Sequence, residues 1–260
     1  MSVKNNILLY KEKSNVAYLT LNRPKAQNAL SSDLLNRLLV ELKKIELNKN
    51  IKVVVISSNG KNFCSGHDLK ELAIDKSKQR FNKLFELCSK VMISIVKLPK
   101  PVIASIQGTA TAAGCQLVAS CDLAIASKSS KFATPGVNIG LFCSTPMVAV
   151  SRNVNKKQTM EMLLMGNLIS PIKAKEIGLI NQIVENDKLE NKTIEMANTK
   201  ASKSAATVAI GKEAFYRQLE MGLEDAYEYT SKVMTINMLK QDAQEGINAF
   251  LNHRDPQWEK

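Results

Sequence analysis

The 260-residue sequence is poor in the side chains that build metal centres and disulfide frameworks. It contains two histidines, and none of its five cysteines belongs to a C-x-x-C pair. Structural zinc sites need clusters of cysteine and histidine at short spacings, so we expect no metal site. An odd number of cysteines without an export signal also favours free thiols in a reducing compartment.

Long apolar runs are missing as well. The chain begins M-S-V-K-N-N, without the apolar stretch of a signal peptide, and no segment reaches the length of a membrane span. This pattern predicts a cytoplasmic protein with no membrane partner. A mitochondrial matrix protein whose transit peptide has been removed is the alternative.

Basic residues outnumber acidic residues by 36 to 24, which gives a net charge of +12. Such an excess attracts nucleic acid, anionic membranes or phosphorylated small molecules. The lysines are scattered, and no dense basic run carries interleaved aromatic residues. We therefore expect no nucleic-acid partner, whereas a ligand with several phosphates suits this surface.

The first part of the chain mixes strand and helix patterns around an ample apolar content of 45%. Residues 7–11 and 16–21 resemble a hairpin, and 53–56 (V-V-V-I) resemble a buried strand. Between them, Ser31 can cap a helix whose leucines recur at helical spacing. Further helices are predicted over 81–96 and 146–165.

After Asp187 every remaining pattern is helical. The predicted helices are 189–202, 205–219, 223–239 and 243–253. We predict an α/β core over residues 1–200 and a helical region over 201–260. Met234 and Met238 are expected in the core of that region, where methionine fills gaps.

Two strand-to-helix junctions stand out. Val102–Ile106 is a short apolar run, residues 108–114 are small, and 116–120 can continue as helix. The other junction is the segment N-F-C-S-G-H-D-L-K-E-L, residues 62–72, after the 53–56 strand. Each junction offers backbone N–H groups, and two such donors aimed at one point would stabilise a thioester oxygen as it becomes negative. Tightly packed turns without a ligand are the alternative.

Five motifs occur together. In chain order they are L-N-R-P-K-A-Q-N-A-L, F-C-S-G-H-D-L, A-G-C-Q-L-V-A-S-C-D-L-A-I-A, F-A-T-P-G-V-N-I-G-L and A-F-L-N-H-R-D-P-Q-W. With them, nearly the whole chain resembles the crotonase, or enoyl-CoA hydratase/isomerase, superfamily. The resemblance implies a crotonase-type ββα spiral core and a C-terminal helical layer that packs between subunits of a homotrimer or hexamer. It also implies an acyl-CoA substrate, lyase or isomerase chemistry in fatty acid metabolism, and no cofactor beyond the coenzyme A of the substrate.

The resemblance assigns residues to a site. The backbone N–H groups of His67 and Ala113 match the oxyanion hole. The adenosine end of coenzyme A falls on Lys25, Ala26, Ser65, Gly66, Asp68 and Leu69, and a neighbouring subunit closes over the nucleotide with Phe250 and His253. The His67 side chain resembles that of family decarboxylases and could bind a carboxylate or a thioester oxygen. A capping role for His67 and Asp68 is the alternative.

The chain departs from the family at the two catalytic glutamates. The motifs place Gln116 and Gly136 at these positions, and neither residue carries a proton near neutral pH. A positioned acid or base contributes roughly 10²–10⁴-fold to a rate, so hydration should be weak. Gly136 is expected to leave room beside the thioester, and Cys143 is either a substitute polar group or a buried apolar residue. Asp122, nearby in the sequence, is expected to be structural.

Three functions therefore remain open. The chain is an enoyl-CoA hydratase, a decarboxylase or hydrolase of CoA thioesters, or a CoA-binding protein without activity.

Overall fold

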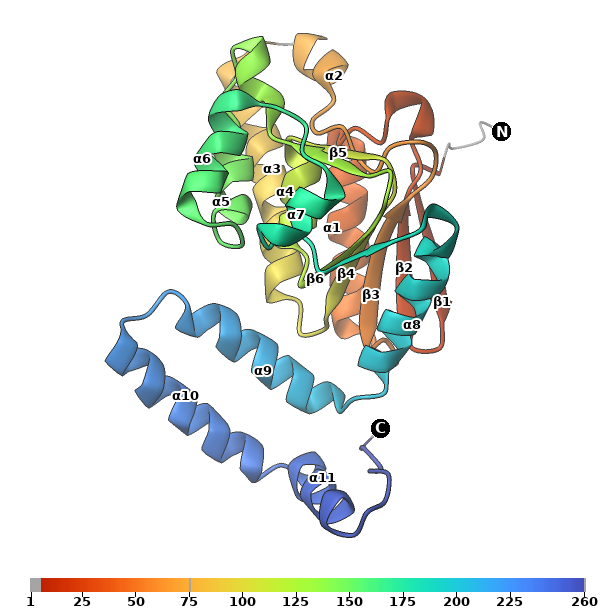
Figure 1. The fold of residues 1–260 in the computed structure, drawn as a ribbon, viewed down its shortest axis with the longest axis vertical. Helices are drawn as coiled ribbons and strands as arrows, with labels where there is room; N and C mark the ends of the chain where they lie inside the picture. The colour runs from red at the N-terminus through yellow and green to blue at the C-terminus, as the bar shows by residue number, and fades with distance from the viewer. Residues whose placement is uncertain (1–5, 75, 260) are drawn as a thin grey trace.

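A six-stranded sheet organises the protein, whose computed structural model describes residues 6–74 and 76–259 (Figure 1). The strands are, in their order across the sheet, β1 (Leu8–Lys13), β2 (Val16–Leu21), β3 (Val53–Ser58), β4 (Val102–Ile106), β6 (Leu123–Ser127) and β8 (Gln182–Val184). β1 and β2 form the predicted antiparallel hairpin, and every later pairing is parallel. The result is the mixed α/β core that the sequence predicts.

Helices cover both faces of the sheet, which is why β3 and β4 are almost entirely buried. On one face α1 (Ser32–Leu47) packs beside α3 (Lys78–Lys97). The predicted cap of α1 is present, since the Ser31 hydroxyl accepts a hydrogen bond from the N–H of Leu34 at 3.3 Å. On the other face α8 (Leu189–Ala201) covers a smaller cluster of valine, isoleucine and leucine side chains.

A second, two-stranded sheet lies at one end of the core. Its strands are β5 (Thr109–Thr111) and β7 (Lys131–Ala133), which pair in parallel. β5 leads directly into α4 (Ala113–Ser120), a helix whose residues are all buried. The alternation of apolar and polar residues did not reveal these strands, although the resemblance placed a strand at the F-A-T-P-G motif. The two strands position the candidate site.

Short helices complete the core: η1 (Pro24–Ala26), α2 (Leu69–Ile74), η2 (Pro135–Ile139), α5 (Ser144–Val150), α6 (Lys156–Met165), α7 (Pro171–Glu176) and η3 (Asn186–Lys188). The single helical segment predicted over 146–165 is wrong, because the chain turns at 151–155. There Asn155 caps the new helix α6 by accepting a hydrogen bond from the N–H of Gln158 at 3.1 Å.

The C-terminal helices α9 (Ala205–Gln218), α10 (Leu223–Met238) and α11 (Gln241–Leu251) pack against one another beside the core (Figure 1). The prediction that Met234 and Met238 are core residues is wrong for the single chain, in which 62% and 40% of their surfaces are exposed. No helix in the described part of the chain is long and apolar enough to cross a membrane.

One polar cluster ties α9 to the core. The Lys212 ammonium donates to an Asp122 carboxylate oxygen at 2.6 Å and to the carbonyl oxygens of Ile95 and Lys100. The Tyr216 hydroxyl donates to the other Asp122 oxygen at 2.9 Å. These contacts give Asp122 a structural role, as expected from its position before β6.

Candidate functional site

Three backbone segments run side by side where the site is expected. Cys64 forms a parallel bridge with Ala110 of β5, and Ala110 pairs on its other side with Phe132 of β7. The N–H of Thr111 donates to the Cys64 carbonyl, and the N–H of Ala112 donates to the Ala133 carbonyl, both at 2.9 Å. The turn after Cys64, the start of α4 and the start of η2 therefore lie next to one another.

Two glycines allow this close approach. A Cβ atom on Gly66, whose φ is +97°, would lie 2.8 Å from the Cβ of Ala112 and 3.3 Å from the nitrogen of Ala113. A Cβ atom on Gly114 would overlap the Cys64 carbonyl oxygen. Because side chains at these positions would push the segments apart, the glycines set the distance between the two junctions.

The backbone N–H groups of His67 and Ala113 are both free. The Leu30 N–H donates to the Gly66 carbonyl, and the Asp68 N–H donates to the Leu30 carbonyl. The N–H of His67, which lies between Gly66 and Asp68, takes no part in this pairing. Ala113 is the first residue of α4, where an N–H has no partner within the helix. Neither group donates a hydrogen bond within the described residues.

The residue before Ala113 has a strained backbone. Ala112 has φ +50° and ψ −118°, a conformation that is costly for any residue with a side chain. Such strain persists where the surrounding structure holds it, often at functional sites. Here it turns the chain from β5 into α4 and places the Ala113 N–H beside Gly66.

The two ring nitrogens of His67 are shielded from solvent, although the residue as a whole is half-buried. Neither nitrogen makes a well-formed hydrogen bond within the described residues; the Leu30 backbone acts on the ring, which packs edge-on against Phe85 with 5.4 Å between the ring centroids. Burial lowers the pKa of His67 below its ordinary value. The ring is therefore neutral at neutral pH and carries one donor and one acceptor nitrogen.

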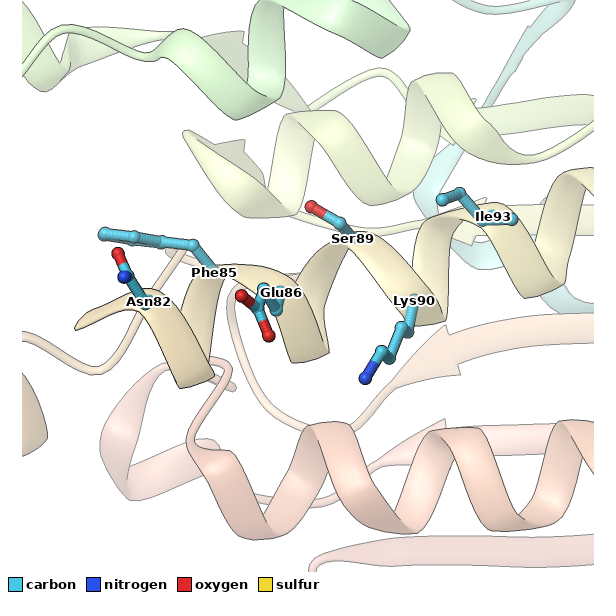
Figure 2. A pocket seen from close by; sticks show the side chains of 6 residues that line it. All are labelled: Asn82, Phe85, Glu86, Ser89, Lys90 and Ile93. Atoms are coloured by element: carbon cyan, nitrogen blue, oxygen red, sulfur yellow. The ribbon is translucent and has the colours of Figure 1, made fainter. Parts of the chain in front are cut away.

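Phe85 also lines a surface hollow of about 420 Å³ along one face of α3 (Figure 2). The lining side chains are spaced along successive turns of the helix and are Asn82, Phe85, Glu86, Ser89, Lys90 and Ile93. Phe85 thus connects the hollow with His67. Sequence analysis did not identify this surface.

The residues predicted to bind the adenosine end of coenzyme A lie in η1 and in the 65–69 segment, which contact each other. The N–H of Ser65 donates to the Gln27 carbonyl at 3.2 Å, which brings this segment beside Lys25 and Ala26. Lys25 and Leu69 are exposed. Ser65 and Gly66 lie between these two exposed residues and the start of α4.

Asp68 is engaged by protein groups. Its carboxylate accepts hydrogen bonds from the N–H groups of Lys70 and Glu71 and pairs with the Arg23 guanidinium at 2.8 Å. Burial alone would raise the pKa of Asp68, but the hydrogen bond from Arg23 and the backbone N–H groups hold it below its usual value. The Asp68 side chain therefore caps the start of α2, which is the alternative role that the sequence left open for it.

Gly136 has no room for a side chain. It lies in η2, and a Cβ atom there would overlap the Leu141 carbonyl oxygen and approach the Cys143 sulfur at 2.8 Å. The same turn is closed by the Leu141 N–H, which donates to the Gly136 carbonyl at 2.9 Å. The expectation that Gly136 leaves room beside a thioester is wrong, because the chain itself fills the space.

The other two predicted catalytic side chains are also buried. Gln116, only 4% exposed, points its amide oxygen toward the Cys88 sulfur of α3 at 4.0 Å. Burial raises the pKa of the Cys143 thiol, so this group stays protonated at neutral pH. Neither side chain is a proton acceptor in the neutral range.

Phe250 and His253 are not brought to this site. They lie at the end of α11, at the opposite end of the molecule from α2 and β5 (Figure 1). Phe250 is 79% exposed. Within one chain, these residues cannot act together with His67 and Ala113.

Thr134, which follows β7 beside the candidate site, was not identified by sequence analysis. It is fully buried between β7 and η2, and its hydroxyl has no partner among the described residues. Nothing in the local sequence A-T-P-G distinguishes it. Across the described chain, no cluster of three or more His, Cys, Asp and Glu side chains could hold a metal ion.

Comparisons with known proteins match this arrangement. Residues 11–260 match the family described as Enoyl-CoA hydratase/isomerase. The human protein named enoyl-CoA hydratase domain-containing protein 3, mitochondrial, is 47% identical over 240 residues, which cover 92% of this chain and 79% of that protein. A crystal structure of the human protein has a TM-score of 0.94 at 44% identity and covers 97% of this chain and 100% of that one. A crystal structure of an enoyl-CoA hydratase from Mycobacterium smegmatis has a TM-score of 0.95 at 45% identity and covers 98% and 99%.

Proposed function

This chain belongs to the enoyl-CoA hydratase/isomerase family, and on that premise we propose that it binds an acyl-CoA thioester and polarises the carbonyl oxygen with the backbone N–H groups of His67 and Ala113. The main support for the proposal is the close approach of Gly66 to Ala113. It brings the two segments that carry the free N–H groups of His67 and Ala113 next to each other. Loss of one such donor typically costs about 2.7–4 kcal/mol of transition-state stabilisation.

Hydration by this site is weak, because no carboxylate stands where the family hydratases carry their glutamates. Gln116 cannot transfer a proton, and Gly136 is closed against any side chain. Each missing acid or base is worth roughly 10²–10⁴-fold, or about 3–5 kcal/mol. The proposal therefore keeps acyl-CoA binding and leaves out the usual proton transfers.

Decarboxylation of a malonyl-type thioester is the second candidate. Loss of CO₂ breaks the bond between the α-carbon and the carboxylate and leaves its electron pair as an enolate on the thioester oxygen. The two N–H donors stabilise that charge, and no carboxylate base is needed. Hydrolysis needs a base to activate water, and the lowered pKa of His67 makes its neutral imidazole a weak base, so decarboxylation is the better fit of the two. A binding protein without activity is the outcome if neither reaction occurs.

The ligand spans several elements in this proposal. The Lys25 ammonium serves the phosphates of coenzyme A as a point charge, and the acyl group extends past Phe85 into the hollow along α3 (Figure 2). The chemistry uses only coenzyme A and protein groups.

A homotrimer, paired into a hexamer, completes the site. Phe250 and His253 lie too far from their own site to cover its nucleotide, so a neighbouring subunit supplies them. Exposed apolar side chains on the C-terminal helices support this assembly; they include Leu223, Tyr227, Met234, Leu239 and Phe250.

The mitochondrial matrix is the proposed compartment, in place of the cytoplasm. The support is the word "mitochondrial" in the printed names of the human, mouse and zebrafish relatives. A reducing matrix also suits five cysteines that are all free and buried.

A paired assay on one preparation tests the function: acetyl-CoA binding by calorimetry and crotonyl-CoA hydration by loss of absorbance. The proposal predicts binding with little or no hydration. Brisk hydration would contradict the argument from Gln116 and Gly136, and absence of binding would contradict the thioester site itself.

A further inference from the structure

The direction of the His67 N–H is set from the far side of its own peptide group. The Leu30 N–H donates to the Gly66 carbonyl at 2.7 Å. A peptide group is planar and trans, so the C=O of one residue and the N–H of the next point in opposite directions. The hydrogen bond from Leu30 to Gly66 therefore aims the His67 N–H away from Leu30.

The same relation holds one peptide group further back. The Leu30 N–H shares its peptide group with the Ala29 carbonyl, and this carbonyl accepts a hydrogen bond from Nη1 of Arg23. Two hydrogen-bonded peptide groups thus connect the Arg23 guanidinium with the His67 N–H. Because Ala29, Leu30 and Gly66 are all buried, water does not compete for the hydrogen bonds between them.

A cation at one end of such a chain polarises the groups that follow it. Each hydrogen bond withdraws electron density from the next peptide group, which strengthens successive bonds by roughly 10–30%. The Arg23 side chain is 20% exposed, so water screens its charge only in part. Its Nη2 pairs with Asp68 at 2.8 Å, which fixes the guanidinium in place and offsets part of its charge. The His67 N–H is therefore a stronger donor than an isolated backbone N–H.

The Ala113 N–H is oriented in a different way. It shares its peptide group with the Ala112 carbonyl, which accepts a hydrogen bond from the Gln116 N–H within α4 at 3.0 Å. This donor is aimed by its own helix, so a change at Arg23 should leave it in place.

We propose that Arg23 is a positioning residue for the thioester site, which aims and polarises the His67 N–H through two peptide groups without touching the substrate. The inference rests on the proposed oxyanion hole and adds to it a charged side chain. It also gives the arginine of the motif L-N-R-P-K-A-Q-N-A-L a role beyond its ion pair with Asp68.

Nuclear magnetic resonance of the free protein observes the donor itself. The sequence contains two histidines, so ¹⁵N-histidine labelling gives two backbone amide signals, from His67 and His253. Arg23→Gln removes the charge and keeps a hydrogen-bond donor, whereas Arg23→Lys keeps the charge. The amide proton of His67 should move to lower chemical shift in Arg23→Gln and stay near its wild-type position in Arg23→Lys. His253, whose N–H donates to the Phe250 carbonyl at the end of α11, is the internal reference.

Infrared spectroscopy of bound acetyl-CoA, labelled with ¹³C at the carbonyl, measures the effect on the ligand. In the wild-type protein the carbonyl band should shift to lower frequency. Arg23→Gln should reduce this shift by at least roughly a tenth, because the weakened His67 donor then acts beside an unchanged Ala113 donor, and Arg23→Lys should restore it. Tyr216→Phe is the control for lost stability, since it removes a hydrogen bond to Asp122 in the link between α9 and the core, and it should keep the full shift.

The possible results separate the inference from the function on which it rests. An unmoved His67 amide signal or an unchanged band shift in Arg23→Gln would overturn the inference and leave the oxyanion hole standing. Equal losses in Arg23→Gln and Arg23→Lys would also overturn it, because the charge would then have no part. A bound thioester without any band shift in the wild-type protein would overturn the proposed function, and the amide signal of the free protein would still decide whether Arg23 polarises the His67 N–H.

Discussion

Gly136 shows how one residue can close a catalytic position. Its missing side chain is not an empty space, because the Leu141 carbonyl and the Cys143 sulfur occupy it. A carboxylate at position 136 would need the turn through residue 143 to move. Position 136 therefore has room for a hydrogen atom but not for a catalytic side chain.

Substitution of this glycine should destabilise the protein. Gly136→Ala overlaps the Leu141 carbonyl, so we expect the free energy of unfolding to fall by about 1–3 kcal/mol, measured by urea denaturation. Gly211→Ala is the control, because nothing lies within 4 Å of its added Cβ in α9; it should raise stability by up to about 1 kcal/mol. A Gly136→Ala protein as stable as wild type would show that the turn yields easily.

His67 predicts a dependence of stability on pH. Burial holds its pKa below the ordinary value of 6.5, so the unfolded chain binds more protons than the folded one just below that pH. The free energy of unfolding should therefore fall as the pH drops through this range. His67→Phe should flatten this part of the profile, measured by urea denaturation at several pH values. Parallel profiles for the two proteins would contradict a buried neutral imidazole.

At the residue scale, the assignment of His67 and Ala113 as donors came from the resemblance to the family and stays a prediction. The surroundings of other side chains could not be predicted from the sequence. The closed space beside Gly136 depends on Leu141, and the isolation of Thr134 depends on its burial between two elements. Neither leaves a local signal, because both arise from tertiary packing.

At the scale of the elements, the main contact between the C-terminal helices and the core is the polar link from α9 to Asp122 at the start of β6. Lys212 and Asp122 form an ion pair with side chains only 7% and 16% exposed. A buried charge left without its partner is costly, and each neighbouring element contributes a group to this cluster. The C-terminal helices are thus held to the core by a polar anchor.

Removal of Lys212 should be strongly destabilising. Lys212→Met leaves the Asp122 carboxylate without its cation, and we expect a loss of about 3–5 kcal/mol in urea unfolding. Tyr216→Phe removes one hydrogen bond to the same carboxylate and should cost only about 1 kcal/mol. Equal losses in the two variants would mean that the ion pair adds nothing beyond a neutral contact.

Long periodic elements were predictable, and short ones were not. The hairpin β1–β2, the capped helix α1 and the helices α8 to α11 follow from alternation, capping and helical spacing. β5 and β7 have three residues each, too few to show alternation, and they form because the segments pair with one another. The break between α5 and α6 carries no proline or glycine, so the composition of 151–155 did not reveal it.

At the scale of the whole molecule, α9 to α11 expose more apolar surface than a single chain requires. Met234 is 62% exposed and Phe250 is 79% exposed. Exposed apolar patches of this kind mark contact surfaces. This distribution agrees with a C-terminal layer that packs between subunits in the proposed assembly.

The assembly can be tested by sedimentation. We expect the wild-type chain to sediment as a trimer or hexamer, and Met234→Lys to shift it toward smaller species, because a charge would be buried at the interface. Ser231→Lys, at an exposed polar position of the same helix, is the matched surface control. A wild-type monomer at micromolar concentration would contradict the assembly.

Polarisation of the thioester carbonyl is the central claim, and isotope-edited infrared spectroscopy measures it directly. With acetyl-CoA labelled with ¹³C at the carbonyl, two hydrogen bonds from His67 and Ala113 predict a carbonyl band shifted to lower frequency on binding. Ala113→Pro removes one of the two donors at the first residue of α4, and in variant protein that still binds the thioester the shift should shrink. A bound thioester whose band stays at its solution frequency in the wild-type protein would contradict the account.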